Sequence, residues 1–360
     1  MAEQFIGRWL YEEERLNPGY LRVLDGIVEE ICRGSPPAGS TCSVVLPAFV
    51  NAHTHLGDSF AHPAPRGTVK SVVGPGGYKH QMLSSAPADV KLVGMRASID
   101  HMLRTGTTLF ADFREEGREG VEAIKYALAD RPVRGIVLGR PPASEDAGEA
   151  SIRLLEFCDG LAFSAVSDWP LDVLASASES CRRSRKLFSL HVSEAEREPI
   201  EDVLDLKPNF IVHMTAAPEE DIASCAEAGV PIVVCPRANA FFGLYPNIPR
   251  FLSTGATVAL GTDNAMICRP DMLSELRAAY ALSLQHGGIS PADAISLATL
   301  SGRKVLNAEG QITTEMSVSD DLIVVDVEGE DPLLELVSSA AKGSVSAVAQ
   351  RGRLRRPSFG

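Results

Sequence analysis

The sequence of 360 residues has no uninterrupted apolar run of the roughly 18 to 20 residues that a membrane-spanning helix requires. It also has no excess of basic charge, because 34 Lys and Arg stand against 47 Asp and Glu, for a formal net charge of −13. Nucleic acids and anionic membranes both favour a basic surface, so we expect neither as a partner. The first residues lack the basic-then-apolar pattern of a secretory signal, and we therefore expect a cytoplasmic protein.

Cysteine is scarce, and the spacing of the cysteines suggests no pairs. The seven cysteines are odd in number, run from Cys32 to Cys268 and form no CxxC pair. This argues against a disulfide framework and against a cysteine-based zinc knuckle, and it fits a reducing compartment. Low-complexity segments and repeats of 20 to 50 residues are also absent from the sequence, which excludes a solenoid. The 45% hydrophobic and 22% charged residues are typical of a globular protein with a sizeable core.

What recurs along the chain is a short apolar run followed by a helical pattern. Near-continuous apolar runs are typical of strands buried on both faces of a parallel sheet. We expect eight such strands, at residues 44–50, 107–111, 133–138, 160–164, 187–190, 210–212, 231–234 and 257–260. Helical patterns follow at residues 90–103 and from Pro218 onward. Eight strand–helix repeats predict a (β/α)8 barrel of the TIM type, with a doubly wound open sheet as the alternative.

The two ends of the chain do not follow this repeat. Residues 5–45 have the pattern of short strands with turns at 17–19 and 36–39, and residues 322–325 and 345–348 are again strand-like. We therefore predict a small β-rich domain formed by both termini, from residues 1–44 and 313–360. The barrel is predicted to occupy residues 45–312.

Candidate catalytic residues lie where the predicted barrel strands end. His53 and His55 follow the first strand, His191 ends the fifth, His213 the sixth and Asp263 the eighth. Barrel enzymes carry their reactive groups at this end of the strands. Each residue alone has an ordinary explanation, such as a hydrogen-bonded core histidine or a helix cap, but together they converge on one axis. Several imidazoles and one carboxylate suit a divalent ion, most simply Zn²⁺, with Fe or Mn as alternatives.

Four segments carry a resemblance to a known family. Residues 46–56, LPAFVNAHTHL, resemble the PGFVNAHTHL signature of the amidohydrolase superfamily. Residues 191–194, HVSE, resemble the HxxE element of its deaminase branch, which holds cytosine, guanine and S-adenosylhomocysteine deaminases and the triazine hydrolases. Residues 235–239, CPRAN, are similar to that branch's CPRSN segment, and residues 258–263, VALGTD, to its VALGTD.

This resemblance implies a role for each matched residue. It implies one metal ion bound by four ligands, namely His53, His55, His191 and Asp263. Glu194 would move protons between water, ring nitrogen and departing amine, and Asp263 would accept a proton from the attacking water. His213 would orient that water or polarise the substrate. Two-metal members usually bridge their ions with a carboxylated lysine on the fourth strand, and residues 158–168 contain no lysine, so one ion is expected.

Substrate-binding residues are expected in the segment after the first strand. Residues 56–88 are rich in glycine and proline and are too long for a bare connection. His80 in this segment and Arg114 beyond the second strand could donate hydrogen bonds to ring carbonyls or to an anionic substituent. Asn239, in the CPRAN segment, completes the candidate set.

The sequence supports three functional hypotheses. The first is hydrolytic deamination of an amino-substituted N-heterocycle, a base or nucleoside-like compound, by a metal-activated water. The second keeps the metal but opens a cyclic amide, as imidazolonepropionases do, or displaces a non-amine group. The third is a non-catalytic barrel that binds a metabolite. The zinc-dependent nucleobase deaminases of the other fold are excluded, because the HxE and PCxxC elements that they require are missing. The sequence leaves open whether the chain forms a homo-oligomer.

Overall fold

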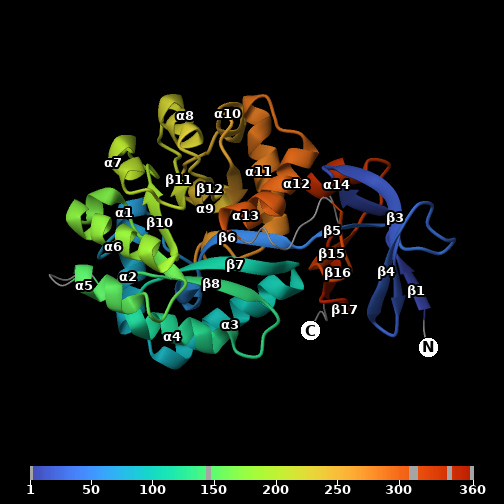
Figure 1. Cartoon of the computed structure of the whole chain (residues 1–360), viewed down its shortest axis with the longest axis horizontal. Coiled ribbons are helices and arrows are strands. Elements are labelled where there is room, and N and C mark those ends of the chain that lie inside the picture. The colour runs from blue at the N-terminus through green and yellow to red at the C-terminus, as the bar shows by residue number, and fades with distance from the viewer. Residues whose placement is uncertain (1–2, 143–146, 308–314, 339–342, 357–360) are drawn as a thin grey trace.

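The computed structural model describes residues 3–142, 147–307, 315–338 and 343–356. These residues form two sheets of different kinds (Figure 1). The larger sheet lies among most of the helices, whereas the smaller sheet, at the right of Figure 1, contains the first and last described strands of the chain. None of the described helices is long and apolar enough to cross a membrane.

The larger sheet is parallel throughout. Its strands are β6 (Phe49–His55), β7 (Thr107–Arg114), β8 (Arg134–Gly139), β9 (Gly160–Phe163), β10 (Leu187–Val192), β11 (Phe210–His213), β12 (Ile232–Val234), β13 (Val258–Leu260) and β14 (Asp263–Asn264). Neighbours in the sheet follow chain order from β6 to β13. After β13 the chain forms β14, which pairs with β6 and so returns the last strand to the first. This is an arrangement of the TIM-barrel type.

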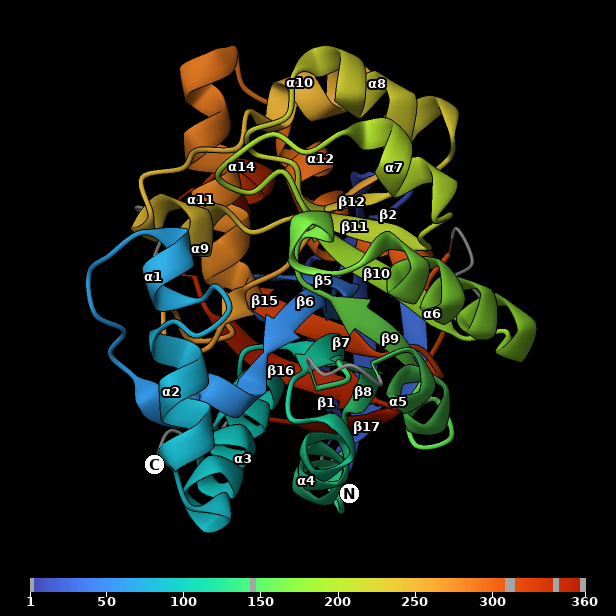
Figure 2. The same cartoon turned by 90° about the vertical axis from the view of Figure 1, so that its left-hand side faces the viewer.

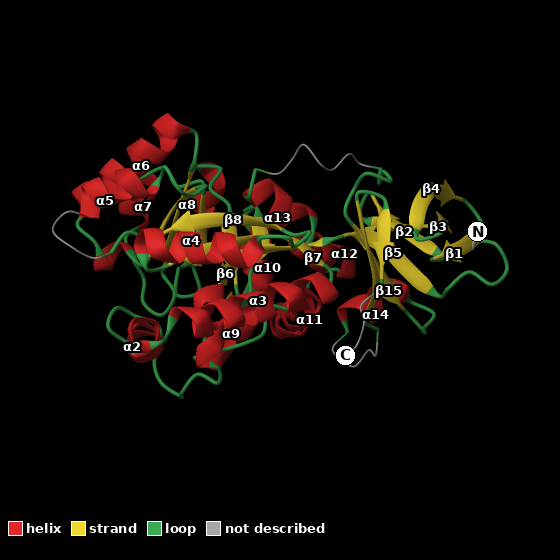
Figure 3. Cartoon of the chain, turned by 90° about the horizontal axis from the view of Figure 1, so that it is seen from below, coloured by secondary structure: helices red, strands yellow, loops and turns green. Residues whose placement is uncertain are grey.

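Helices surround this sheet (Figures 2 and 3). The longer ones are α2 (Tyr78–Ser85), α3 (Ala88–Arg104), α4 (Gly117–Leu128), α5 (Ala147–Leu154), α6 (Leu171–Ser184), α8 (Glu219–Glu227), α11 (Met272–Ser283) and α12 (Pro291–Ala298). The shorter ones are η1 (Leu56–Ala61), α1 (Val69–Val72), η2 (Val166–Asp168), α7 (Ile200–Asp205), α9 (Pro236–Phe241), α10 (Ile248–Ser253), η3 (Leu284–His286), α13 (Leu300–Val305) and α14 (Pro332–Val337). In α3, Met95, Ile99 and Met102 are buried at helical spacing, which places one apolar face against the core.

The smaller sheet joins the two ends of the chain. Its order is β1 (Glu3–Ile6), β3 (Arg15–Leu24), β2 (Trp9–Glu12), β5 (Ser43–Pro47), β15 (Leu322–Asp326), β16 (Val345–Gln350), β17 (Arg353–Arg355) and β4 (Ile27–Arg33). In its middle, β15 is antiparallel to both β5 and β16. Leu10, Leu21, Val45 and Leu322 are buried in one apolar cluster, so residues more than 270 positions apart share this core.

Two local expectations are wrong. The apolar run at residues 44–50 is not one barrel strand, because β5 ends at Pro47 in the smaller sheet and β6 begins at Phe49 in the larger one. The residues on both sides of Ala48 are equally apolar, so the hydrophobicity pattern does not show that the chain passes from one sheet to the other. The turn expected at residues 17–19 lies inside β3, which pairs with β2 as far as Pro18 and with β4 from Gly19 onward.

Candidate active site

The predicted catalytic residues meet at one end of the larger sheet. His53 and His55 lie at the carboxyl end of β6, and their spacing of two residues sends both imidazoles to the same side of the strand. His191 is the penultimate residue of β10, His213 ends β11 and Asp263 begins β14. Because all these strands are parallel, their carboxyl ends share one face of the barrel.

A close contact between β6 and the β13–β14 segment positions Asp263. The Asn51 side chain accepts a hydrogen bond from the Thr262 backbone N–H at 3.0 Å and donates one to Thr262 Oγ1 at 2.7 Å. A Cβ atom at Gly261 would lie 2.7 Å from the Cβ of His53, so only glycine allows the two segments to approach this closely. These hydrogen bonds and the close packing hold the VALGTD segment against the FVNAH segment, and they keep Asp263 beside the two β6 histidines.

Four side chains form a compact set of metal-ligand atoms. His53, His55, His191 and Asp263 each offer one nitrogen or oxygen, and these atoms all lie within 4.8 Å of one another. Asp263 Oδ1 lies 3.3 Å from His53 Nε2 and 3.5 Å from His55 Nε2. Neither ring nitrogen of His53 has a hydrogen-bond partner among the described residues. The sequence predicts this set, and the structure brings all four residues together.

The ring nitrogens of two of these histidines face each other. His191 Nδ1 lies 2.8 Å from the Phe163 carbonyl oxygen, and His55 Nδ1 lies 3.1 Å from the Phe113 carbonyl oxygen. Both contacts require a proton on Nδ1, so Nε2 of each neutral ring carries a lone pair. These two Nε2 atoms are only 3.2 Å apart. Two lone pairs at this separation repel each other unless a cation accepts both, and this geometry therefore fits a metal ion.

Electrostatics keep these ligands in the forms that bind metal. Burial lowers the pKa of His53 and His191, and it lowers that of His55 to about 3, so the imidazoles are neutral. Burial alone would raise the pKa of Asp263, but the neighbouring histidines hold it below its ordinary value, so the carboxylate is ionised. Three neutral imidazoles and one carboxylate are a typical donor set for zinc.

A second group of residues adjoins the metal ligands. His213 Nε2 lies 3.6 Å from Glu194 Oε2 and 4.0 Å from Asp263 Oδ2. The Asn239 amide nitrogen lies 3.2 Å from His213 Nδ1 and 3.5 Å from Glu194 Oε1. Because the amide donates to Nδ1, the proton of a neutral His213 sits on Nε2 and points toward the two carboxylates. Burial raises the pKa of Glu194, which makes its carboxyl group a better proton donor and acceptor than an exposed glutamate.

The backbone is strained at two of these residues. His213 has φ of 78° and Asp263 has φ of 59°, a left-handed conformation that is uncommon for residues other than glycine. Such conformations persist only where the surrounding structure imposes them, and they cluster at functional sites. His213 ends β11 and Asp263 lies just past the end of β13, and at both positions the chain turns the side chain into the mouth.

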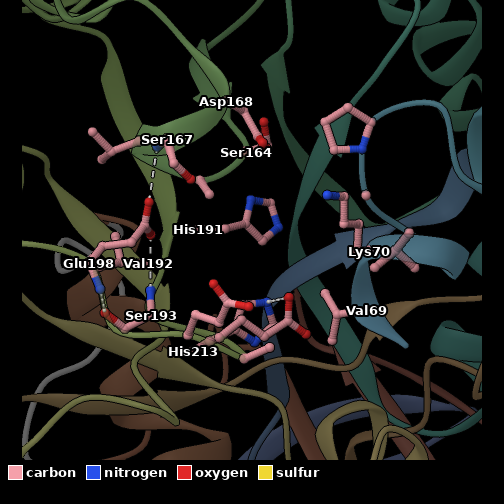
Figure 4. A pocket seen from close by; sticks show the side chains of 18 of the residues that line it. Val69, Lys70, Ser164, Ser167, Asp168, His191, Val192, Ser193, Glu198 and His213 are labelled. Carbon is pink, nitrogen blue, oxygen red and sulfur yellow. Dashed lines mark hydrogen bonds and ion pairs between the residues drawn. The ribbon is translucent and has the colours of Figure 1, made fainter. Parts of the chain in front are cut away.

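The cavity at this mouth has a volume of about 770 Å³, within the usual range for small-molecule sites. His191 and His213 line it (Figure 4), as do Glu194 and Asp263. The segment that carries Glu194 is braced by Glu198, whose carboxylate accepts hydrogen bonds from the backbone N–H of Ser167 at 3.0 Å and of Ser193 at 3.1 Å. Sequence reasoning missed Glu198, which looked like one more acid in a charged run.

The predicted substrate-binding residues fall in different places. His80, on α2, lines the cavity, whereas Asn239 lies beneath it against His213 and Glu194. Arg114 does not line this cavity. Strand alternation turns Phe113 inward, 4.3 Å from the His53 ring, and sends Arg114 to the other side of β7. The structure therefore does not support the predicted direct contact between Arg114 and substrate in this cavity.

A buried charge cluster behind His55 was not expected from the sequence. Glu115 Oε1 lies 2.8 Å from His55 Nδ1 and 3.0 Å from Lys79 Nζ, and Glu115 Oε2 lies 2.6 Å from Arg114 Nη2. Burial would raise the pKa of Glu115, but Lys79, His55 and Arg114 hold it well below its ordinary value. A carboxylate on the outer nitrogen of a metal-binding histidine fixes the orientation of its ring. Local sequence offered no signal, because Lys79 and Glu115 are 36 residues apart.

Comparison with known proteins gives matches over nearly the whole chain. The sequence pattern of the Amidohydrolase family matches residues 44–355. A protein described as a putative aminohydrolase from Methanothermobacter thermautotrophicus is 33% identical over 93% of each chain. The 5-methylthioadenosine/S-adenosylhomocysteine deaminase of Haloquadratum walsbyi is 30% identical and covers 88% of this chain and 79% of its own. The crystal structure of an adenosine deaminase from Xanthomonas campestris with bound zinc matches with a TM-score of 0.80, at 20% identity, over 99% of this chain and 93% of its own.

Proposed function

This chain belongs to the amidohydrolase family, and on that premise we propose that it hydrolytically deaminates an amino-substituted N-heterocycle, a base or nucleoside-like compound. The observation that carries the proposal is the pair of adjoining groups at the barrel mouth. One group offers four metal-ligand atoms within 4.8 Å, and the other offers Glu194 and His213 for proton transfer beside the same carboxylate of Asp263. The names of the Methanothermobacter and Haloquadratum relatives support the same reaction class.

We propose one divalent ion per chain, zinc in the first instance. His53, His55, His191 and Asp263 would hold it, and a bound zinc ion lowers the pKa of water from about 15.7 toward about 7. The single-ion assignment rests on the absence of lysine from residues 158–168, where a bridging ligand for a second ion would stand. Zinc bound to the Xanthomonas adenosine deaminase is consistent with this choice of metal.

The protein residues move the protons that the reaction requires. Deamination replaces a C–NH₂ group by a carbonyl, so the water oxygen must lose both of its protons, while the ring nitrogen gains one of them and the departing amine gains the other. Asp263 is ionised and accepts the proton from water. Glu194, whose pKa is raised, delivers protons to the ring nitrogen and then to the amine. His213 donates from Nε2 to orient the reactants, and Asn239 holds both Glu194 and His213 in place.

The second hypothesis, opening of a cyclic amide or displacement of a non-amine group, uses the same ligands and the same proton carriers. The two reactions differ in product, since only deamination releases ammonia. Zinc-reconstituted protein should therefore be assayed against a library of heterocyclic amines and cyclic amides, with ammonia release and product mass both measured. Ammonia formed in a stoichiometric ratio to product supports deamination. Hydrolysis without ammonia replaces it with the second hypothesis, and no hydrolysis of any compound by the zinc-loaded protein contradicts both.

We also propose a domain division. Residues 45–312 would make a complete (β/α)8 barrel, and residues 1–44 and 313–360 a small β domain. The return of β14 to β6 and the shared sheet of β5 and β15 support this division. Because β5 extends to Pro47, we place the junction at Ala48 rather than at residue 44.

A further inference from the structure

Arg114 is a buried cation that contacts two buried carboxylates. It is 1% exposed and is the largest of the fully buried side chains in the described part of the chain. Its Nη2 lies 2.6 Å from Glu115 Oε2, and its Nη1 lies 3.4 Å from Asp112 Oδ1. The cost of desolvating buried charges offsets much of their attraction, so stability alone does not account for such a cluster.

The two carboxylates contact the metal ligand His55 and its neighbours at different points. Glu115 Oε1 lies 2.8 Å from His55 Nδ1 and so holds the ring. Asp112 Oδ2 accepts a hydrogen bond from the Leu56 backbone N–H at 2.7 Å and one from Thr54 Oγ1 at 3.1 Å. Asp112 therefore holds the residues on both sides of His55, while Glu115 holds its imidazole.

The chain just after His55 leaves space for the guanidinium. A Cβ atom at Gly57 would overlap with Nη1, Nη2 and Cζ of Arg114. The φ angle of Gly57 is not positive, so the backbone conformation does not require glycine at this position. The space that Arg114 occupies requires it instead, and the segment that carries His55 therefore packs directly on the guanidinium.

Arg114 differs from Lys79, which is a second cation on Glu115. Lys79 Nζ donates to Glu115 Oε1 at 3.0 Å from helix α2, and Lys79 lines the cavity, whereas Arg114 does not. An ammonium is a single point charge, but a guanidinium offers two terminal nitrogens in one fixed plane. Arg114 can therefore hold Asp112 and Glu115 at the same time and in a fixed relation to each other.

We propose that Arg114 is a positioning residue for the metal ligand His55, on which it acts through Glu115 at the ring and through Asp112 at the backbone. Outer partners of this kind typically contribute about 10- to 100-fold in metal affinity or activity. The inference rests on the proposed metal site and deepens it. It also gives a role to a residue for which the sequence predicted a substrate contact.

The first test is zinc affinity, measured by competition with a chelator. Arg114→Met should weaken zinc binding about 10- to 100-fold, and Arg114→Lys, which keeps the charge but loses the planar fork, about 3- to 10-fold. If Arg114→Met does not fold, as judged by circular dichroism, Arg114→Lys carries the comparison. Unchanged zinc affinity in the folded variants would overturn the proposal.

Arg303→Lys is the matched control. Arg303 is also buried, at 4% exposure, and its Nη2 donates to the Ala48 carbonyl oxygen at 3.1 Å, at the opposite end of β6 from His55. Loss of its fork should lower thermal stability but leave zinc affinity unchanged. An equal loss of zinc affinity in Arg303→Lys would mean that Arg114 contributes only general stability, and the proposal would fail.

Two further measurements test the route of the effect. In cobalt(II)-loaded protein the visible absorption bands report ligand geometry, and they should shift in Arg114→Lys but not in Arg303→Lys. The loss of zinc affinity from Arg114→Lys should be smaller in a Glu115→Gln background than in the unmodified protein, because one connection to His55 is already missing. Fully additive losses, or an unshifted cobalt spectrum, would contradict an action through Glu115.

Kinetics separate positioning from substrate binding. With saturating zinc, Arg114→Lys should lower kcat for a heterocycle that releases ammonia and leave KM nearly unchanged, since Arg114 does not line the cavity. A raised KM with unchanged kcat would overturn the proposal. The zinc and cobalt measurements need no substrate, so they decide the role of Arg114 even if no compound is deaminated. Ammonia release with normal zinc affinity in the Arg114 variants overturns this role and leaves the reaction standing.

Discussion

The residues at the barrel mouth form two clusters, called here the ligand wall and the charged wall, that obtain their polar groups in different ways. The ligand wall consists of His53, His55, His191 and Asp263, all of which belong to strands of one parallel sheet. The charged wall consists of Lys79, Glu115 and Arg140, which come from α2 and from the chain just past β7 and β8. The ligand wall is composed of neutral imidazoles and one carboxylate, whereas the charged wall is composed of full charges paired across long sequence distances.

This difference shows how a barrel can separate chemistry from specificity. Strand register determines where the ligand atoms stand, because each strand contributes at its carboxyl end and the sheet hydrogen bonds hold the strands together. The charged wall depends on side chains that reach over these ends, so it can change without disturbing the sheet. The two walls meet at one contact, the 2.8 Å approach of Glu115 Oε1 to His55 Nδ1.

The largest expected effect comes from removing a ligand. His53→Ala should reduce the metal content of purified protein from about one ion per chain to a small fraction, and lower turnover at least about 10⁴-fold. The reason is that three donors remain around a site built for four. Elemental analysis and ammonia release measure the two effects. His286→Ala, an exposed histidine of η3, is the control, and two ions per chain in the unmodified protein would contradict the single-ion proposal.

Removing the proton carrier should affect turnover alone. Glu194→Gln preserves size and the contact with Asn239 but removes the exchangeable proton, so kcat should fall about 10²- to 10⁴-fold while metal content is unchanged. Stopped-flow or endpoint ammonia assays with metal analysis of the same sample provide the readout. Glu196→Gln, two residues away on the exposed side of the loop, should behave like the unmodified protein. A change in kcat of less than about 3-fold would reduce Glu194 to a surface acid.

Removing the contact between the two walls should have a smaller effect, and the property that changes should be the affinity for metal. Glu115→Gln removes the carboxylate from His55 Nδ1 and should weaken zinc binding about 10- to 100-fold in competition with a chelator. The matched control is Glu116→Gln, because Glu116 is the next residue and pairs with Lys91 away from the site. Equal zinc affinity in both variants would show that the Phe113 carbonyl alone orients His55.

The smallest expected effect concerns pH and stability. Asp58, buried at the start of η1, accepts hydrogen bonds from Asn264 Nδ2 at 2.7 Å and from the Met266 N–H at 3.0 Å, and burial raises its pKa to about 7. An unfolded aspartate titrates near about 4, so the folded protein holds this proton more tightly. The resulting stabilisation is complete below about pH 4 and is lost as pH rises through about 7.

Asp58→Asn should therefore reduce the fall in thermal midpoint between pH 5 and pH 8 by a few degrees, because an unfolding entropy of about 2.1 cal/mol/K per residue corresponds to roughly 1 to 1.5 °C per kcal/mol for a chain of 360 residues. Thermal denaturation followed by circular dichroism at both pH values gives the comparison. Asp205→Asn, at an exposed position on α7, serves as control and should leave the pH dependence unchanged. An unaltered slope for Asp58→Asn would mean that Asp58 stays ionised throughout this range.

Much of the barrel could be predicted because its strands are buried on both faces. Such strands need apolar residues at nearly every position, so seven of the eight expected strands correspond to β7 through β13 with small shifts at their ends. The exception is residues 44–50, where an apolar run serves two sheets in succession. An apolar run predicts that a strand is buried, but it does not predict in which core the strand lies. The junction at Ala48 could therefore not be predicted from the sequence.

The sequence alone predicted the residues of the ligand wall, because strand periodicity and the parallel arrangement place candidate side chains on one face of the barrel, and the resemblance to amidohydrolase motifs selects four of them. His53, His55, His191 and Asp263 follow from those two rules and from the motifs around them. Only the tertiary structure decided which cation faces the cavity. Arg114 and Arg140 each stand near the carboxyl end of a barrel strand, but strand alternation buries Arg114 behind β7 while Arg140 lines the cavity. The physical reason is that a long charged side chain takes its direction from its neighbours in space, and for Lys79 and Arg140 the charged neighbour is Glu115, which lies 25 or more residues away from each in the chain.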